Sequence, residues 1–108
     1  MSHVTTHVLD AAVGRPAVGV AVALYDAEGA LVAEGVTDAD GRVSDLGPDA
    51  LPAGEYGVVF ETGAYFAATA TPTFYPRVSI DVEIVDTAAH YHVPLLLSPF
   101  AFSTYRGS

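Results

Sequence analysis

The stretch Val78-Ser79-Ile80-Asp81-Val82-Glu83-Ile84 alternates apolar and polar residues without a break. Successive side chains of a β-strand point to opposite sides, so this period of two predicts a strand over 78–84. The four aliphatic side chains share one face, and the three polar side chains share the other. One face of this strand should therefore lie on a core and the other should face water.

Similar segments lie on both sides of this stretch. Period-2 or mixed apolar patterns predict strands around His7 and over residues 18–25, 31–37, 55–61, 91–97 and 100–105. The turn Asp26-Ala27-Glu28-Gly29 predicts a hairpin between the first two of these ranges. Residues 63–69 are short and Ala-rich and form the one predicted helix, with an irregular loop as the alternative. Pro94 has no N–H to give to a ladder, so its position should face away from a neighbour or lie at an edge or bulge.

This arrangement of short strands and frequent turns predicts the fold class. Seven or eight strands with one short helix are typical of an all-β, two-sheet antiparallel sandwich. No internal repeat, linker or low-complexity stretch interrupts the chain. We therefore expect residues 1–108 to form a single β-sandwich domain.

Composition and charge exclude several classes of partner. Thirteen acidic residues face four Arg and no Lys, a net charge of -9 that repels phosphate backbones, so we expect no nucleic-acid partner. No apolar run approaches the roughly 18–20 residues of a membrane span, so we expect no membrane partner. Residues 1–6 lack the basic flank and apolar segment of a secretory signal, which predicts a cytoplasmic location. The absence of cysteine removes disulfides, a thiol nucleophile and thiolate metal ligands.

The histidines are the first candidates for chemistry. His90 and His92 are two residues apart and share a face if this segment is a strand. That spacing suits a pair of metal ligands, with His7 or His3 as a third. However, no cysteine or acidic residue stands beside the pair, and arginines suit an anion better than a cation. We therefore expect no metal and no cofactor.

A metal-free hydrolytic site is the alternative. It needs a base that works near neutral pH, which imidazole provides, and cationic donors for charge that develops on a carbonyl oxygen, which guanidinium provides. Arg42, Arg106 and the histidines would form such a set if the fold brought them together, which spacing alone does not show. No Gly-x-Ser-x-Gly motif occurs, so a nucleophilic serine is disfavoured.

Three motifs in order make the chain resemble a known family. The first two, residues 7–17 and 92–100, are similar to the N-terminal and C-terminal signatures of the transthyretin superfamily: His7-Val8-Leu9-Asp10-Ala11-Ala12-Val13-Gly14-Arg15-Pro16-Ala17 and His92-Val93-Pro94-Leu95-Leu96-Leu97-Ser98-Pro99-Phe100. The ending Tyr105-Arg106-Gly107-Ser108 resembles that of the 5-hydroxyisourate hydrolases, the enzymatic branch of this superfamily. The hormone-carrying branch has Lys, Glu and Thr where this chain has His7, Arg42 and His92. A small departure is Phe100-Ala101-Phe102, where Gly-Tyr is frequent.

The resemblance implies an activity and an assembly. It implies hydrolysis of 5-hydroxyisourate, the urate oxidase product, to 2-oxo-4-hydroxy-4-carboxy-5-ureidoimidazoline. It also implies an eight-stranded transthyretin-like sandwich in a homotetramer, a dimer of dimers with sites where subunits meet. The alternative is a non-catalytic transthyretin-like protein that binds a small ligand.

The resemblance also implies site residues. His92, helped by His7, would activate a water, although which histidine is the stronger base stays open. Arg42 would hold the substrate and stabilise the oxyanion, and Arg106 would add charge or anchor the tail. Tyr105 and Ser108 would position the substrate or protonate the leaving nitrogen. The expected set is therefore catalytic His7, Arg42, His92 and Ser108, with Tyr105 and Arg106 as substrate-binding residues.

Overall fold

The alternating stretch forms the strand that its pattern predicts. A computed structural model describes residues 2–108, and β7 spans Val78–Ile84. Val78 and Ile84 are buried, and Ile80 and Val82 are half-buried, whereas the polar residues between them are exposed. The half-burial of the two central residues follows from the position of β7 as the last strand of its sheet.

One sheet contains four antiparallel strands in the order β4-β3-β6-β7. The other three strands are β3 (Ala21–Tyr25), β4 (Leu31–Val36) and β6 (Gly54–Phe60). The hairpin predicted between β3 and β4 is present, with Asp26 Oδ1 accepting hydrogen bonds from the N–H groups of Glu28 and Ala30. Gly29 completes this turn at φ 80°, a left-handed conformation that glycine adopts without strain.

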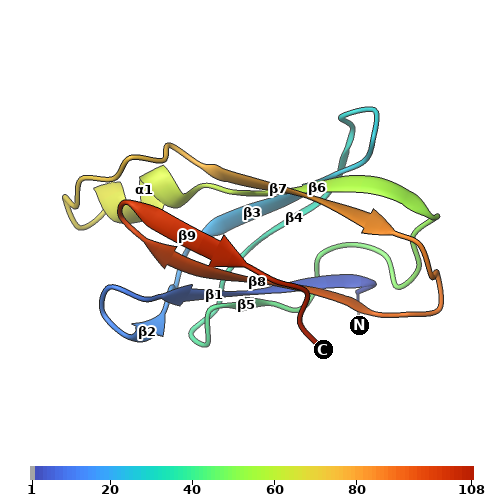
Figure 1. Ribbon diagram of the computed structural model, residues 1–108, viewed down its shortest axis with the longest axis horizontal. Helices are drawn as coiled ribbons and strands as arrows, with labels where there is room; N and C mark the ends of the chain where they lie inside the picture. Colours follow the sequence, from blue (N-terminus) through green and yellow to red (C-terminus); the bar gives the residue numbers. More distant parts are fainter. Residues whose placement is uncertain (1) are drawn as a thin grey trace.

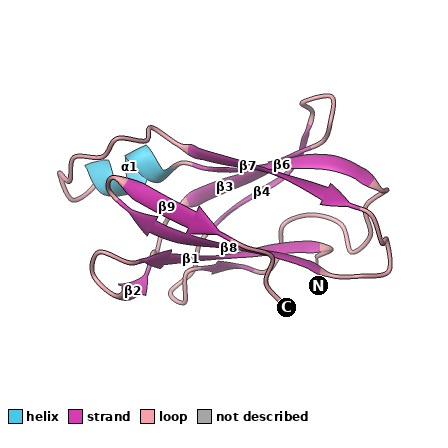
Figure 2. Ribbon diagram, viewed as in Figure 1, coloured by secondary structure: helices cyan, strands magenta, loops and turns pink. Residues whose placement is uncertain are grey.

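The second sheet has five strands in the described chain. Its main order is β2-β1-β8-β9, and β5 pairs with β1 beside β2. The bounds are β1 Val4–Asp10, β2 Arg15–Pro16, β5 Arg42–Val43, β8 Tyr91–Ser98 and β9 Ala101–Thr104. Figures 1 and 2 show the two sheets as two layers, with the helix at one end of the molecule and both chain termini toward the other.

The prediction of a two-sheet sandwich is confirmed, with two differences in detail. The sequence predicts seven or eight strands, and residues 2–108 contain nine because β2 and β5 are two-residue strands that no periodicity can reveal. The pairing of β1 with β8 is parallel, whereas every other strand pair in these residues is antiparallel. A tight turn forces consecutive strands to be antiparallel, whereas all four strands of the other sheet lie between β1 and β8 in sequence.

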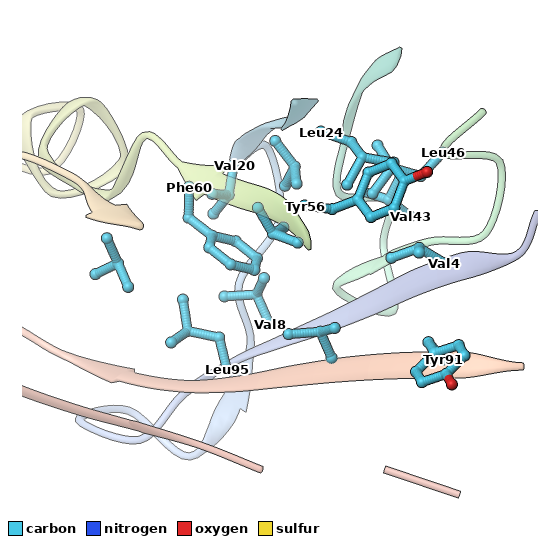
Figure 3. Close-up of a cluster of buried hydrophobic side chains, with 14 of the residues drawn as sticks. Val4, Val8, Val20, Leu24, Val43, Leu46, Tyr56, Phe60, Tyr91 and Leu95 are labelled. Atoms are coloured by element: carbon cyan, nitrogen blue, oxygen red, sulfur yellow. The ribbon is translucent and has the colours of Figure 1, made fainter. Parts of the chain in front are cut away.

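The core lies between the two sheets (Figure 3). Val8 and Leu95 contribute from one sheet and Leu24, Val58 and Phe60 from the other, all with no exposed surface. Burying such side chains stabilises the fold by roughly 1.5–3 kcal/mol each relative to leaving them in water. The core therefore holds the inner face of the β1–β8 pair rigid, and the outer face is left free for chemistry.

Helix α1 (Thr62–Ala67) closes one end of the sandwich, close to the predicted range 63–69. Phe66 is buried beneath it. The Tyr65 hydroxyl donates a hydrogen bond to Asp10 Oδ2 at 2.8 Å and so ties the helix to the end of β1. None of the helical structure in residues 2–108 has the length and apolarity for a membrane crossing.

Pro94 determines where the chain end leaves its sheet. The pairs Leu95↔Thr104 and His92↔Gly107 share one antiparallel register, which places Pro94 opposite Tyr105. His92 accepts a hydrogen bond from Gly107 N–H through its carbonyl, so residues 92 and 94 both direct their backbone groups toward the chain end. Pro94 has no N–H to give there, and the ladder opens over residues 105 and 106 before it closes again at Gly107.

Candidate active site

Thr5 joins two histidines on the outer face of the second sheet. The parallel register sets Thr5 beside His92, and Thr5 Oγ1 lies 2.8 Å from His92 Nδ1 and 2.8 Å from His90 Nε2. The expectation that His90 and His92 share a face is confirmed by these contacts. Sequence reasoning missed Thr5, although its position two residues before His7 on one strand was the available signal.

His7 lies two residues beyond Thr5 on β1, and so two pairs along the ladder from the Thr5–His92 pair. It pairs with Pro94 on β8 and with Arg42 on β5, so β1 carries His7 between the other two site strands. His7 Nε2 lies 2.9 Å from the carbonyl oxygen of Asp40. A carbonyl only accepts, so Nε2 carries the proton and donates. Nδ1 is then the nitrogen that holds the lone pair of neutral His7.

The turn before β5 presents Arg42. Asp38 Oδ1 accepts the N–H groups of Asp40 and Arg42 at 2.9 and 3.0 Å, and these two bonds hold the pKa of the Asp38 carboxyl below its usual range. Gly41 stands in this turn at φ 76°, and a Cβ there would lie 2.3 Å from the Val8 carbonyl oxygen. Only glycine fits both the conformation and the space, so the Asp-Ala-Asp-Gly sequence builds a rigid support for Arg42.

A cavity of about 340 Å³ lies over these residues. Three of the four predicted catalytic residues, Arg42, His92 and Ser108, line it. The remaining lining residues are Thr5, Thr6, Val43, Ser44 and His90. Its volume is in the range of small-molecule sites. The structure thus brings together residues from near both ends of the chain with the one predicted residue, Arg42, that lies in its middle.

The cavity holds His92 in its neutral form. Partial burial lowers the pKa of His92, and the positive charges of Arg42, His7 and His90 lower it further. Since Nδ1 is engaged with Thr5, Nε2 is the nitrogen left for a ligand or a water. A neutral imidazole with a free nitrogen beside a guanidinium can take a proton from water while the cation attracts an anionic or carbonyl-rich ligand.

Gly107 keeps the chain end at this cavity. Its N–H donates to the carbonyl oxygen of His92 at 2.9 Å, which holds Ser108 at the cavity wall. Ser108 therefore lines the same cavity as Arg42 and His92, and its catalytic role stays a prediction.

Tyr105 and Arg106 lie elsewhere. They line a second cavity of about 390 Å³ between β7 and the end of the chain, and they do not line the one that holds Arg42 and Ser108. The Arg106 guanidinium carbon is 4.3 Å from the centroid of the Tyr91 ring, and Arg106 donates to the His90 carbonyl oxygen at 3.4 Å. This placement fits an anchor for the tail, and the substrate-binding role of both residues stays a prediction.

The remaining histidine, His3, packs against the Tyr91 ring and hydrogen-bonds to the backbone through both ring nitrogens. His3 is buried, its Nδ1 accepts the N–H of Leu51 at 2.8 Å, and its Nε2 donates to the Ala89 carbonyl oxygen at 2.7 Å. Within residues 2–108, no three His, Cys, Asp or Glu side chains gather closely enough to hold a metal ion.

Comparison with known proteins now identifies the family. The model of the HIUase/Transthyretin family matches residues 4–107. The chain belongs to this family. The resemblance noted in the sequence is thereby confirmed, and the transthyretin-like sandwich with it.

Members of the HIUase/Transthyretin family with different names resemble this chain. The 5-hydroxyisourate hydrolase of Salmonella dublin is 44% identical over 108 residues, which cover 96% of this chain and 79% of that protein. The structure of Klebsiella pneumoniae 5-hydroxyisourate hydrolase matches with a TM-score of 0.90 and 43% identity, over 97% of this chain and 98% of that one. Sea bream transthyretin in complex with thyroxine also reaches a TM-score of 0.90, at 34% identity over 96% and 93% of the two chains. The fold alone therefore does not distinguish the hydrolases from the transthyretins in this family. The distinction has to come from the site residues.

Proposed function

We propose that this protein is a 5-hydroxyisourate hydrolase. The observation that carries the proposal is the placement of His92, with Nδ1 held by Thr5, in one cavity with Arg42 and Ser108, while His7 pairs with Arg42 on the neighbouring strand. The lowered pKa of His92 favours its neutral form. The 5-hydroxyisourate hydrolases among its relatives support it, since they match the chain over nearly its whole length. The reaction opens a ring amide by addition of water.

In the proposed mechanism, His92 is the base. Nε2 removes a proton from a water that attacks the ring carbonyl, a role that contributes about 10²–10⁴-fold in enzymes. Arg42 holds the substrate and stabilises the negative charge that develops on the carbonyl oxygen. His7, whose Nε2–H is fixed on the Asp40 carbonyl, orients the water or substrate through Nδ1. Ser108 positions the leaving nitrogen, which takes up a proton as the C–N bond breaks.

A test follows the substrate directly. Urate and urate oxidase generate fresh 5-hydroxyisourate, and its ultraviolet absorbance is followed with and without this protein after chelator treatment. Decay that accelerates in proportion to protein and survives the chelator supports a metal-free hydrolase. His92→Ala should then lose at least ~10²-fold in turnover. A folded protein that does not accelerate decay contradicts the proposal and leaves a ligand-binding member of the family.

We also propose the assembly that the family resemblance implies, a homotetramer built as a dimer of dimers with sites at subunit interfaces. Strands β7 and β9 each lie at one end of their sheet with one edge unpaired in the described part of the chain, and large apolar side chains such as Val13, Val18 and Phe100 are exposed. In a tetramer, neighbouring subunits would pair these strand edges and bury these apolar side chains. Sedimentation velocity that gives the mass of a monomer at micromolar concentration would contradict it. The cytoplasmic location stays a prediction.

A further inference from the structure

The hydroxyl of Thr5 contacts both His92 and His90, although a single contact would be enough to orient His92 as a base. The Thr5 side chain is only 8% exposed, and its one hydroxyl lies 2.8 Å from a nitrogen of each histidine. A threonine hydroxyl has one proton to donate and lone pairs to accept. Thr5 can therefore donate to at most one of the two histidines and must accept from the other, so the tautomers of His90 and His92 are coupled.

Two orders of protons place the Thr5 proton between the two rings and are compatible with these distances. In the first, His92 Nδ1–H donates to Thr5 Oγ1, and Thr5 donates to His90 Nε2. In the second, His90 Nε2–H donates to Thr5, and Thr5 donates to His92 Nδ1, which leaves the proton of His92 on Nε2. The guanidinium of Arg42 lines the same cavity and repels positive charge on His92. The Arg42 cation beside the His92 ring favours the first order. In that order His92 Nε2 carries a lone pair and not a proton.

The surroundings of the two histidines then decide where a proton is better held. His92 is half-buried, with the charges of Arg42 on β5 and His7 on β1 near it. His90 is exposed to solvent and precedes β8. Water stabilises an imidazolium at His90 far better than the cavity stabilises one at His92. Other ionisable groups also lie near His90. The Arg106 guanidinium contacts its carbonyl oxygen, Arg42 lines the same cavity, and His3 and Asp49 line a shared surface hollow.

We propose that Thr5 is a positioning residue that fixes the tautomer of His92 and passes the proton taken from the attacking water to His90. The proposal rests on the proposed hydrolase function. An O–H bond of water breaks, and its proton goes to His92 Nε2 as the oxygen adds to the carbonyl carbon. The Nδ1 proton of His92 moves to Thr5 Oγ1, and the Thr5 proton moves to His90 Nε2. His92 is then neutral and His90 is an imidazolium. When the C–N bond breaks, the same chain runs backward and returns one proton to the leaving nitrogen.

The tautomer is tested without substrate. Two-bond ¹H–¹⁵N correlation spectra, recorded at alkaline pH where both rings are neutral, show which ring nitrogen carries a proton. The unsubstituted protein should show His92 protonated at Nδ1 and His90 unprotonated at Nε2. Thr5→Val keeps the β-branched shape and removes only the hydroxyl, so it should shift His92 toward the Nε2–H tautomer. Thr5→Ser should preserve the original one. His92 protonated at Nε2 in the unsubstituted protein would overturn the proposal.

Turnover tests the transfer itself. Thr5→Val should lower kcat at least about tenfold, with KM changed by less than about threefold, because a misplaced lone pair costs the chemical step and not binding. Thr5→Ser should stay within about threefold of the unsubstituted enzyme in kcat. Thr73→Val is the matched control, since it removes a hydroxyl that donates to the Pro99 carbonyl oxygen at 2.6 Å, away from the cavity. Thr5→Val with unchanged kcat and an unchanged pH profile overturns the proposal.

His90→Gln separates transfer from packing. Glutamine offers an acceptor on an exposed site but cannot carry the proton, so kcat should fall at least about tenfold and the acid limb of its pH profile should move. Turnover by His90→Gln equal to that of the unsubstituted enzyme overturns the transfer to His90. If the unsubstituted protein itself shows no turnover, the proposed function fails, whereas the tautomers in the spectra still report on the contact between Thr5 and the two histidines.

Discussion

Gly107 packs its backbone directly against the imidazole of His92. The N–H of Gly107 donates to the His92 carbonyl oxygen at 2.9 Å, and a Cβ added to Gly107 would lie 2.6 Å from His92 Cδ2 and 3.1 Å from Pro94 Cγ. The backbone at the chain end therefore restricts the position of the His92 ring, the proposed base. A side chain at this position has to displace either the ring or the tail.

Replacement of Gly107 tests whether its contact with the His92 ring matters for catalysis. Gly107→Ala should lower kcat by roughly 10- to 100-fold, because a displacement of less than 1 Å at a reacting group is enough for such losses. The free energy of unfolding should change by less than about 1 kcal/mol, since the contact lies at the chain end. Gly57→Ala is the control, because its added Cβ would be at an ordinary 3.4 Å from Asp81 Oδ1. Unchanged kinetics in Gly107→Ala would show that the ring does not depend on this contact.

Arg42 should control the pKa of His92 as well as bind substrate. His92 acts as a base only when neutral, so kcat/KM should fall as the pH drops through its pKa, which burial and the Arg42 charge hold below 6.5. Arg42→Gln should raise that pKa toward the ordinary value, and NMR titration of the His92 ring measures it without substrate. Arg77→Gln removes a guanidinium that pairs with Glu61 and should leave the titration of His92 unchanged. A His92 pKa that does not rise in Arg42→Gln would contradict this electrostatic coupling.

The turn that carries Arg42 depends on one carboxylate oxygen. Asp38→Ala removes the acceptor of two N–H groups, so the turn should loosen, KM should rise several-fold and kcat should fall. Asp38→Asn keeps one acceptor oxygen and should show the smaller effect. Because the pKa of Asp38 is lowered in the fold, its stabilising contribution is present above the unfolded value of about 3.9 and is lost as the pH falls through the folded value. Chemical shifts of the Asp40 and Arg42 amides should report this loosening between about pH 2 and 5, a range that extends roughly two units below and one unit above the ordinary carboxyl pKa.

Tyr65 should matter for stability and not for catalysis. Its hydroxyl donates to buried Asp10, and burial together with this bond raises the pKa of Tyr65 to about 12. Tyr65→Phe leaves a carboxylate oxygen of Asp10 without this donor and should cost about 1–3 kcal/mol in urea unfolding. The contribution is complete below pH 10, the unfolded value, and declines as the pH rises toward about 12. Tyr25→Phe is the control. A loss of turnover at neutral pH in a fully folded Tyr65→Phe would contradict a purely structural role.

Several features could be read from local patterns. The alternation over 78–84 predicts β7 with its bounds and its core face, because a period of two depends only on the geometry of a single strand. The same rule places His90 and His92 on one face. The turn before Arg42 is equally local, since Asp and Gly at fixed offsets determine it. The expected irregular position of Pro94 was also local, and the structure adds that it opens the ladder at residues 105 and 106.

Local sequence patterns could not predict which residues meet at the candidate site. Thr5 meets His92 because β1 and β8 pair in parallel with one register, and 87 positions separate the two residues in sequence. Arg42 reaches His7 through a two-residue strand that carries no periodicity. The placement of Arg106 over Tyr91, away from the Arg42 cavity, depends on where the tail leaves the ladder.

By itself, then, the sequence determined which of the longer segments are strands, which faces are apolar and which residue types were present for acid–base chemistry. The tertiary structure decided which of those residues meet and which nitrogen of His92 stays free. The physical reason is that strand periodicity is a property of neighbouring residues, whereas the register between distant strands is set by packing of the whole core between the two sheets.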